Sequence, residues 1–178
     1  MQIKLPEAIL SYPSLGKPAK DNFDAEKAPR FKCDLIFPKG TDLTELNEAI
    51  AKHIADDFKG KEPKNMPLKL AETQIDKETG LVKSLYDQGD YFIKPWSGEG
   101  DPPALISPQN KPGYAPQNFK GGNLVNVIVN TWAMTTFSGT IGLGLMAVQW
   151  VREGKQVGST VNLNLFSEVP AEPINFQP

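Results

Sequence analysis

Residues 123–152 read NLVNVIVNTWAMTTFSGTIGLGLMAVQWVR, and the rest of the predicted fold is organised around this stretch. Apolar and polar residues alternate along it on both sides of a short Thr/Ser/Gly connection. This alternation is typical of a half-buried β-hairpin and not of a helix. Residues 137–140 should form the turn, because Gly139 can adopt a positive φ without strain.

The two faces of the first arm of this hairpin differ in character. One face carries residues that suit a core, namely Val125, Val127, Val129, Thr131 and Ala133. The other face mixes amides with a tryptophan, namely Asn126, Ile128, Asn130, Trp132 and Met134. We therefore expect a sheet that buries one side and offers the other side to a ligand with flat rings.

Length and composition predict one mostly β domain. The 178 residues are enough for a sizeable core, and the apolar fraction of 39% should allow the chain to fold. The 16 prolines and 15 glycines argue for strands with long, irregular connections. The formal net charge is −2, so a nucleic-acid face would have to arise from local segregation of charge.

Two further features predict a soluble intracellular protein that has no contact with membranes. The single cysteine, Cys33, cannot form an internal disulfide, which indicates a reducing compartment. The N-terminus has no signal-peptide pattern, and no apolar run approaches the roughly 18 residues that a membrane-spanning helix needs.

Outside the hairpin, the alternation predicts five more strands, at residues 3–12, 31–37, 91–96, 104–107 and 161–165. Pro13 and Gly16 should break the first of them. In the strand at 91–96, Phe92, Lys94 and Trp96 should share one face.

One amphipathic helix is predicted after the second strand. Asp42 is its expected N-cap, with Glu45 reaching back to complete a capping box. Apolar residues then recur every four positions until Gly60 ends the helix; they are Leu46, Ile50, Ile54 and Phe58. Residues 61–90 are polar, and we interpret them as a long excursion with little regular structure and as a candidate flexible flap.

Five or six strands with one inserted helix favour an OB-fold, a five-stranded Greek-key barrel with one inserted α-helix and long loops. A β-sandwich is the alternative. The OB-fold domain should span residues 1–160, and residues 161–178 should form a C-terminal strand and a mildly acidic tail.

Signatures of catalysis are missing, so we expect no enzyme, no cofactor and no metal. His53 has no second ligand at metal-binding spacing, and Cys33 falls on the core face of its strand. The sequence GLGLMA at 142–147 fits GxGxxA, but the strand pattern continues through it where a phosphate loop would start a helix. The acidic residues that lack calcium-loop spacing are Asp21, Asp24, Asp76 and Glu78.

Aromatic and basic residues are interleaved in FIKPW at 92–96, KPGY at 111–114 and FK at 119–120. Single-stranded nucleic acid requires this combination, because bases stack on rings, with roughly 1–3 kcal/mol per base, and cations neutralise phosphates. Core packing is the competing interpretation for any single ring. Lys94 favours the binding interpretation, because a lysine between Phe92 and Trp96 does not suit a core.

Several motifs follow one another along the chain, namely SYPSLGKP at 11–18, RFKCDLIFPKG at 30–40, NMPLKLAE at 65–72, GDYFIKPWS at 89–97, GGNLVNVIVNTWA at 121–133 and GLMAVQWVREG at 144–154. In this order, over roughly residues 5–158, the chain resembles the phage single-stranded DNA-binding proteins that have an OB-fold. The resemblance implies a protein of the host cytoplasm that coats single-stranded DNA during phage DNA replication or recombination and that catalyses no reaction.

Carried onto this chain, the resemblance implies a DNA-binding face that we assign from the pattern to Tyr12, Lys17, Arg30, Lys32, Phe92, Lys94, Trp96, Lys111, Tyr114 and Trp132. The implied partners are single-stranded DNA and phage replication or recombination proteins, and a homo-oligomer is left open. Many such proteins recruit partners through a strongly acidic C-terminal tail. This chain departs from that pattern, since Glu168 and Glu172 are the acidic residues of its tail.

Two alternatives belong to other classes. A phage structural or assembly module that binds protein partners would oligomerise and would have no affinity for oligonucleotides. An enzyme such as a nuclease would need carboxylates or histidines clustered at fixed spacing, which this sequence lacks.

Overall fold

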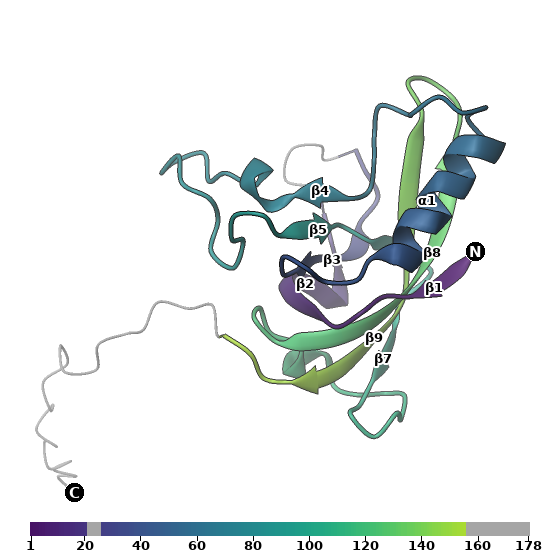
Figure 1. Ribbon diagram of the computed structural model, residues 1–178. Coiled ribbons are helices and arrows are strands. Elements are labelled where there is room, and N and C mark those ends of the chain that lie inside the picture. The colour runs from purple at the N-terminus through teal and green to yellow at the C-terminus, as the bar shows by residue number, and fades with distance from the viewer. Residues whose placement is uncertain (21–25, 156–178) are drawn as a thin grey trace, which may run out of the picture.

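The computed structural model describes residues 1–20 and 26–155, a mostly β structure with one α-helix (Figure 1). The strands are β1 (Gln2–Lys4), β2 (Ala8–Ala19), β3 (Arg30–Phe37), β4 (Lys69–Leu70), β5 (Tyr91–Ile93), β6 (Trp96–Gly98), β7 (Ala104–Ile106), β8 (Leu124–Met134) and β9 (Thr140–Arg152). The helices are α1 (Thr44–Asp56) and the short 3-10 turns η1 (Ala71–Thr73) and η2 (Pro116–Asn118). The strand predicted at 161–165 and the tail at 161–178 lie outside the described residues.

The predicted hairpin is confirmed as β8 and β9, which pair antiparallel from Leu124–Arg152 to Met134–Thr140. Its predicted core face is also confirmed, because Val125, Val127, Val129 and Thr131 are buried. Gly139 adopts a φ of 78° in the turn, as expected, and Phe137 adopts a φ of 58°. The predicted turn at 137–140 is shifted, because the strands leave residues 135–139 between them and Thr140 already pairs with Met134.

Five strands are linked in a closed cycle of pairings. β8 pairs with β2, β2 with β3, β3 with β6, β6 with β9, and β9 returns to β8. β1 and β7 extend the sheet beyond β8 and β9, and β5 and β4 continue from β3. The main core lies inside this cycle, where apolar side chains from β2, β3, β5, β8 and β9 meet those of α1.

Helix α1 lies beside β8 and closes one end of the main core (Figure 1). Leu46 and Ile50 are buried there, as the four-residue spacing predicted, and Ile54 and Phe58 are partly buried against the same core. The predicted end at Gly60 was wrong, because α1 ends at Asp56. The N-cap prediction was wrong, because the N-cap is Leu43 and no side chain caps it. Asp42 lies one residue further out, where its Oδ1 accepts hydrogen bonds from Thr44 N (3.0 Å) and Thr44 Oγ1 (2.6 Å). These bonds lower the pKa of Asp42.

Two strand predictions need correction. The segment predicted at 3–12 contains β1 and the start of β2, and β2 runs through Pro13 and Gly16 to Ala19. Two register shifts against β3 accommodate these residues, because a bulge leaves the extra residues unpaired. The segment predicted at 91–96 is divided at Lys94 and Pro95 into β5 and β6, which pair with opposite ends of β3.

The excursion, residues 61–90, has little regular structure, as predicted: β4 and η1 are its regular elements among the described residues. It packs on the outer face of β3 and β5, where Ile36, Ala71, Tyr86 and Phe92 form a second small core. The sheet is therefore buried on both faces at this point. Among the described residues, no helix is long and apolar enough to cross a membrane.

Truncating Leu46 to Ala should lower the free energy of unfolding by about 2–5 kcal/mol, because Leu46 is 1% exposed and its loss leaves a cavity between α1 and the sheet. Urea unfolding followed by circular dichroism measures this change. The control is Glu48→Ala on the exposed side of α1, which should stay within about 0.5 kcal/mol. Equal losses in both variants would show that α1 is not anchored through Leu46.

Candidate nucleic-acid interface

A groove of about 570 Å³ lies between β2, β3, β6 and the excursion, and we call it the basic groove. Six cationic side chains line it: Lys20, Lys27, Arg30, Lys32, Lys83 and Lys94. Asp34 is the one acidic residue of its lining among the described residues. The chain of net charge −2 therefore concentrates positive charge locally, as a nucleic-acid face would require.

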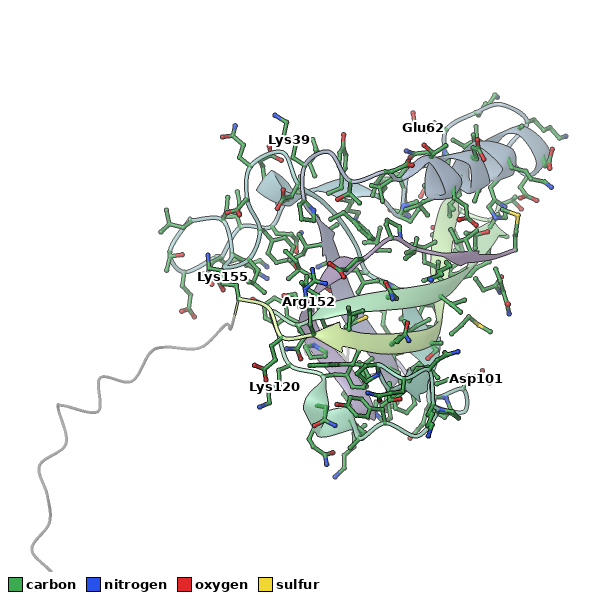
Figure 2. All side chains as sticks on the ribbon, turned by 60° about the horizontal axis from the view of Figure 1, so that its bottom comes forward. Lys39, Glu62, Asp101, Lys120, Arg152 and Lys155 are labelled. Atoms are coloured by element: carbon green, nitrogen blue, oxygen red, sulfur yellow. The ribbon has the colours of Figure 1, made fainter. Side chains whose placement is uncertain are left out.

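Elsewhere on the surface, acidic and basic side chains are mixed (Figure 2). Arg152, for example, donates two hydrogen bonds to the Glu7 carboxylate, at 2.8 and 2.7 Å. The basic groove differs from this surface because six cationic side chains and one acidic side chain line it together.

Tyr12 projects into the basic groove from a register shift in β2. Its φ of 44° is unusual for a residue other than glycine, and its side chain is 57% exposed. Bulges of this kind redirect a side chain from its regular position on the sheet. Lys83 of the excursion lies over the Tyr12 ring, with Nζ 5.5 Å from the ring centroid, within the range of a cation–π interaction.

Arg30, Trp96 and Trp132 form a row of flat groups at the other end of the basic groove. The Arg30 guanidinium carbon lies 3.8 Å from the centroid of the Trp96 ring. Trp96 and Trp132 meet edge to face, with ring centroids 6.2 Å apart and an interplanar angle of 82°. The pairing of β6 with β3 fixes this arrangement, because Lys32 lies opposite Trp96 and Arg30 lies opposite Gly98.

The negative charge of Asp34 is compensated within the protein. Tyr86 donates a hydrogen bond from its hydroxyl to Asp34 Oδ2 (2.6 Å), and Lys94 Nζ lies 3.4 Å from the same oxygen. Burial and the neighbouring Asp34 raise the pKa of Tyr86, so its hydroxyl keeps the proton that it donates. Lys94 also donates to Gln74 Oε1 (2.9 Å), which ties a groove cation to the excursion.

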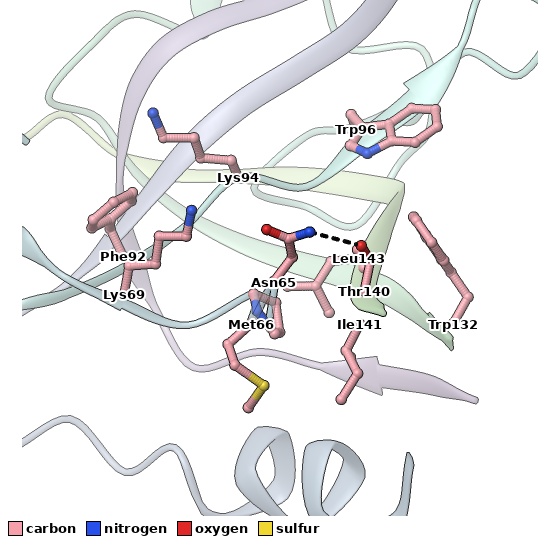
Figure 3. Close-up of a pocket in the computed structure, with 12 residues that line it drawn as sticks. Asn65, Met66, Lys69, Phe92, Lys94, Trp96, Trp132, Thr140, Ile141 and Leu143 are labelled. Carbon is pink, nitrogen blue, oxygen red and sulfur yellow. Dashed lines mark hydrogen bonds between the residues drawn. The ribbon is translucent and has the colours of Figure 1, made fainter. Parts of the chain in front are cut away.

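Two further hollows adjoin the basic groove at Trp96. One, of about 190 Å³, lies below Lys94 and Trp96 and includes Asn65, Met66 and Lys69 (Figure 3). The other, of about 460 Å³, lies between Trp132 and the glycines Gly98 and Gly144. Because Trp96 lines all three, the tryptophan pair stands where they meet.

The glycines of the GxGxxA stretch make room for this tryptophan pair. Gly142 lies opposite Trp132 in the β8–β9 register, and a Cβ at this position would overlap the Trp132 ring. Gly144 lies opposite Trp96 in the parallel pairing of β6 and β9. The prediction that residues 142–147 continue a strand and form no phosphate loop is confirmed, because they lie within β9.

The structure brings together six of the ten residues assigned to the DNA-binding face. Five line the basic groove, namely Tyr12, Arg30, Lys32, Lys94 and Trp96, and Trp132 contacts Trp96. Phe92 does line the hollow of Figure 3 with Lys94 and Trp96, as the shared face predicted. However, Phe92 is 0% exposed, because the excursion covers it, so its ring is closed to stacking.

The three other assigned residues lie away from the basic groove. Tyr114 packs against Phe119 and Trp150, with ring centroids 5.8 and 6.2 Å away. Lys111 belongs to a turn that hydrogen bonds with Ser107, and Lys17 is exposed near the end of β2. Three groove cations, Lys20, Lys27 and Lys83, were not predicted. The first two flank the polar connection between β2 and β3 and could have been found from that position, whereas Lys83 lies in the excursion, where no periodic pattern marks a face.

No cluster of three or more His, Cys, Asp or Glu side chains that could hold a metal occurs within residues 1–20 and 26–155. His53 is hydrogen bonded to Asp57 Oδ2 (2.6 Å) and to Thr131 Oγ1 (3.0 Å). Cys33 is buried in the main core, as predicted, and this burial raises the pKa of its thiol.

One family model matches most of the chain. The model of the family described as the single-stranded DNA-binding protein of Enterobacter phage Enc34 matches residues 1–168. No curated protein sequence matches the chain.

Three solved structures have the same fold at low sequence identity. The single-stranded DNA-binding protein of bacteriophage Enc34 in complex with single-stranded DNA has a TM-score of 0.66 and 18% identity, covering 88% of this chain and 89% of that chain. The C-terminal truncation of the Enc34 protein has a TM-score of 0.64 and 19% identity, covering 87% of each chain. Gp2.5, a single-stranded DNA-binding protein of bacteriophage T7, has a TM-score of 0.55 and 14% identity, covering 90% of this chain and 96% of that chain.

Replacing Gly142 by Ala should displace the Trp132 ring and lower the free energy of unfolding by about 1–3 kcal/mol, because the added methyl group has no room. Near-ultraviolet circular dichroism and urea unfolding measure both effects. Gly144→Ala is the matched control on the same strand, since its Cβ would meet Asn130 atoms at ordinary distances of 3.5 and 3.7 Å. If Gly142→Ala and Gly144→Ala changed the spectrum equally, the position of the Trp132 ring would not depend on the missing side chain of Gly142.

Proposed function

The chain belongs to the family of the single-stranded DNA-binding protein of Enterobacter phage Enc34, and from this premise we propose that it binds single-stranded DNA in the basic groove. One observation carries the proposal. Six cationic side chains line the basic groove, and the Trp96–Trp132 pair lies at one end of it. Cations there would neutralise phosphates, while the Tyr12 ring and the Arg30 guanidinium, which Trp96 backs, would stack on bases.

The proposed binding tolerates any base sequence. Lysine and arginine side chains dominate the groove lining, and phosphates do not differ between nucleotides. Rings stack on every base, because each base has a π face. Affinity should therefore fall with rising salt concentration and change little with base identity.

The closed cycle of five strands, with α1 inserted after β3, supports the further proposal that this domain is an OB-fold with a Greek-key barrel over residues 1–160. OB-folds bind oligonucleotides on an exposed face of the barrel. The basic groove lies on β2 and β3, at an open part of the sheet.

In the cell, the protein would coat single-stranded DNA in the host cytoplasm during phage DNA replication or recombination and would catalyse no reaction. The similarity to gp2.5 of bacteriophage T7 and to the Enc34 protein solved with single-stranded DNA supports this role. Phage replication or recombination proteins are its proposed partners.

Trp96→Ala should weaken the binding of an oligo-dT strand by about 1–3 kcal/mol at every salt concentration, because the variant loses the ring that backs the Arg30 stacking surface. Fluorescence anisotropy of a labelled oligo-dT measures the affinity, and a duplex of equal length should bind less tightly. Phe137→Ala is the control, since this ring is 99% exposed and lies outside the basic groove and both adjoining hollows. Failure of the wild-type protein to bind oligo-dT would overturn the proposed function.

Lys32→Gln should make the slope of log K against log salt concentration less negative by about 0.7, because one fewer phosphate contact releases one fewer set of counterions. The same titration at four or more salt concentrations gives the slope. Lys52→Gln removes a cation that is also exposed, from α1 and outside the basic groove, and should leave the slope unchanged. Identical slopes in both variants would place the phosphates away from β3.

A further inference from the structure

We propose that residues 71–90 of the excursion form a fixed wall of the DNA groove and that Lys83 binds a phosphate from that side. This inference rests on the proposed function and adds the path of the strand, which would run between the excursion and the outer face of β2 and β3. Lys83 and Lys94 line the basic groove together with Arg30 and Lys32, so cations would contact the backbone from two sides.

The wall is attached to the sheet by apolar packing. Tyr86 and Ala71 are buried against Ile36 and Phe92 on the outer face of β3 and β5. The Tyr86 and Phe92 rings meet edge to face, with centroids 5.5 Å apart. Because the Tyr86 hydroxyl also donates to Asp34, one residue joins the excursion to both the second core and the groove.

Hydrogen bonds join the two ends of the proposed wall, residues 71–90. Ala71 N donates to Asp90 O (2.9 Å), and Gly89 N donates to Glu72 Oε1 (3.0 Å). The buried Asp90 carboxylate accepts a further bond from Lys39 N (2.9 Å). The two ends of residues 71–90 are thereby held together and against the segment that follows β3.

Within the excursion, Gln74 and Lys83 are held side by side. Lys83 N donates to Gln74 O (2.9 Å), and an antiparallel bridge joins Ile75 and Val82. Asp76 completes the turn, because its Oδ1 accepts hydrogen bonds from Glu78 N and Thr79 N, each at 2.9 Å. These bonds lower the pKa of Asp76, so the carboxylate that holds the turn stays ionised at neutral pH.

This pairing directs two neighbouring side chains of the excursion to two different residues of the groove. Gln74 contacts Lys94, which follows β5, and Lys83 lies over Tyr12, which belongs to β2. The excursion therefore supplies one cation of the basic groove, Lys83, and orients a second, Lys94, through its hydrogen bond to Gln74. A phosphate in the groove would meet Lys83 opposite Arg30 and Lys32, whose strand forms the other side.

Lys83→Gln tests the wall. We expect it to make the salt slope of oligo-dT binding less negative by about 0.7, the effect of losing one phosphate contact. Lys83→Arg keeps the positive charge and should restore the wild-type slope. The matched control is Lys77→Gln, which removes a cation from the turn of the same excursion, outside the residues that line the basic groove.

The proposed wall is overturned if Lys83→Gln and Lys77→Gln have the same salt slope while Lys32→Gln has a less negative one. The proposed function still stands in that case. If wild-type protein does not bind oligo-dT, the proposed function fails, and the wall fails with it. A slope flattened by Lys83→Gln and restored by Lys83→Arg supports the wall.

Discussion

The antiparallel pairing of β8 with β9 positions most of the other strands. β8 pairs with β1, β2 and β9, and β9 pairs with β6, β7 and β8, so most strands take their position from this hairpin. Its alternation places Val127 and Val129 in the main core and Trp132 on the opposite face. A slip of one residue would exchange these faces, so the core and the tryptophan pair are fixed by the same register.

Strand β3 shows how the sheet changes from a covered surface to an open one. Its outward side chains are Arg30, Lys32, Asp34 and Ile36. The excursion buries the last of them, whereas the first three line the basic groove. The change from charged to apolar residues along one face therefore marks the place where the excursion begins to cover the sheet, and the groove is the part that it leaves open.

Elements that depend on a local apolar pattern could be predicted from the sequence. Contacts between segments that are distant in the sequence could not. The hairpin, α1 and the core face of β3 follow from periodicity, and Arg30, Lys32 and Trp96 were found because they lie in or beside alternating strands. The covering of Phe92 could not be predicted, because Tyr86 and Ala71 reach it through an excursion without periodicity. Lys83 was missed for the same reason. Pro13 and Gly16 were wrongly predicted to end the first strand, because bulges let β2 continue past them.

The geometry of Arg30 and Trp96 bears on how one groove could accept every base. One face of the Trp96 ring is covered by the guanidinium of Arg30, and the Trp132 ring meets Trp96 edge to face. Because guanidinium groups stack on bases as aromatic rings do, the outer face of Arg30 is itself a stacking surface, backed by Trp96. In the proposed function, such a layered platform would hold a base without contacting its edge. A platform of this kind selects for single strands, whose bases are free to stack, and not for any particular sequence.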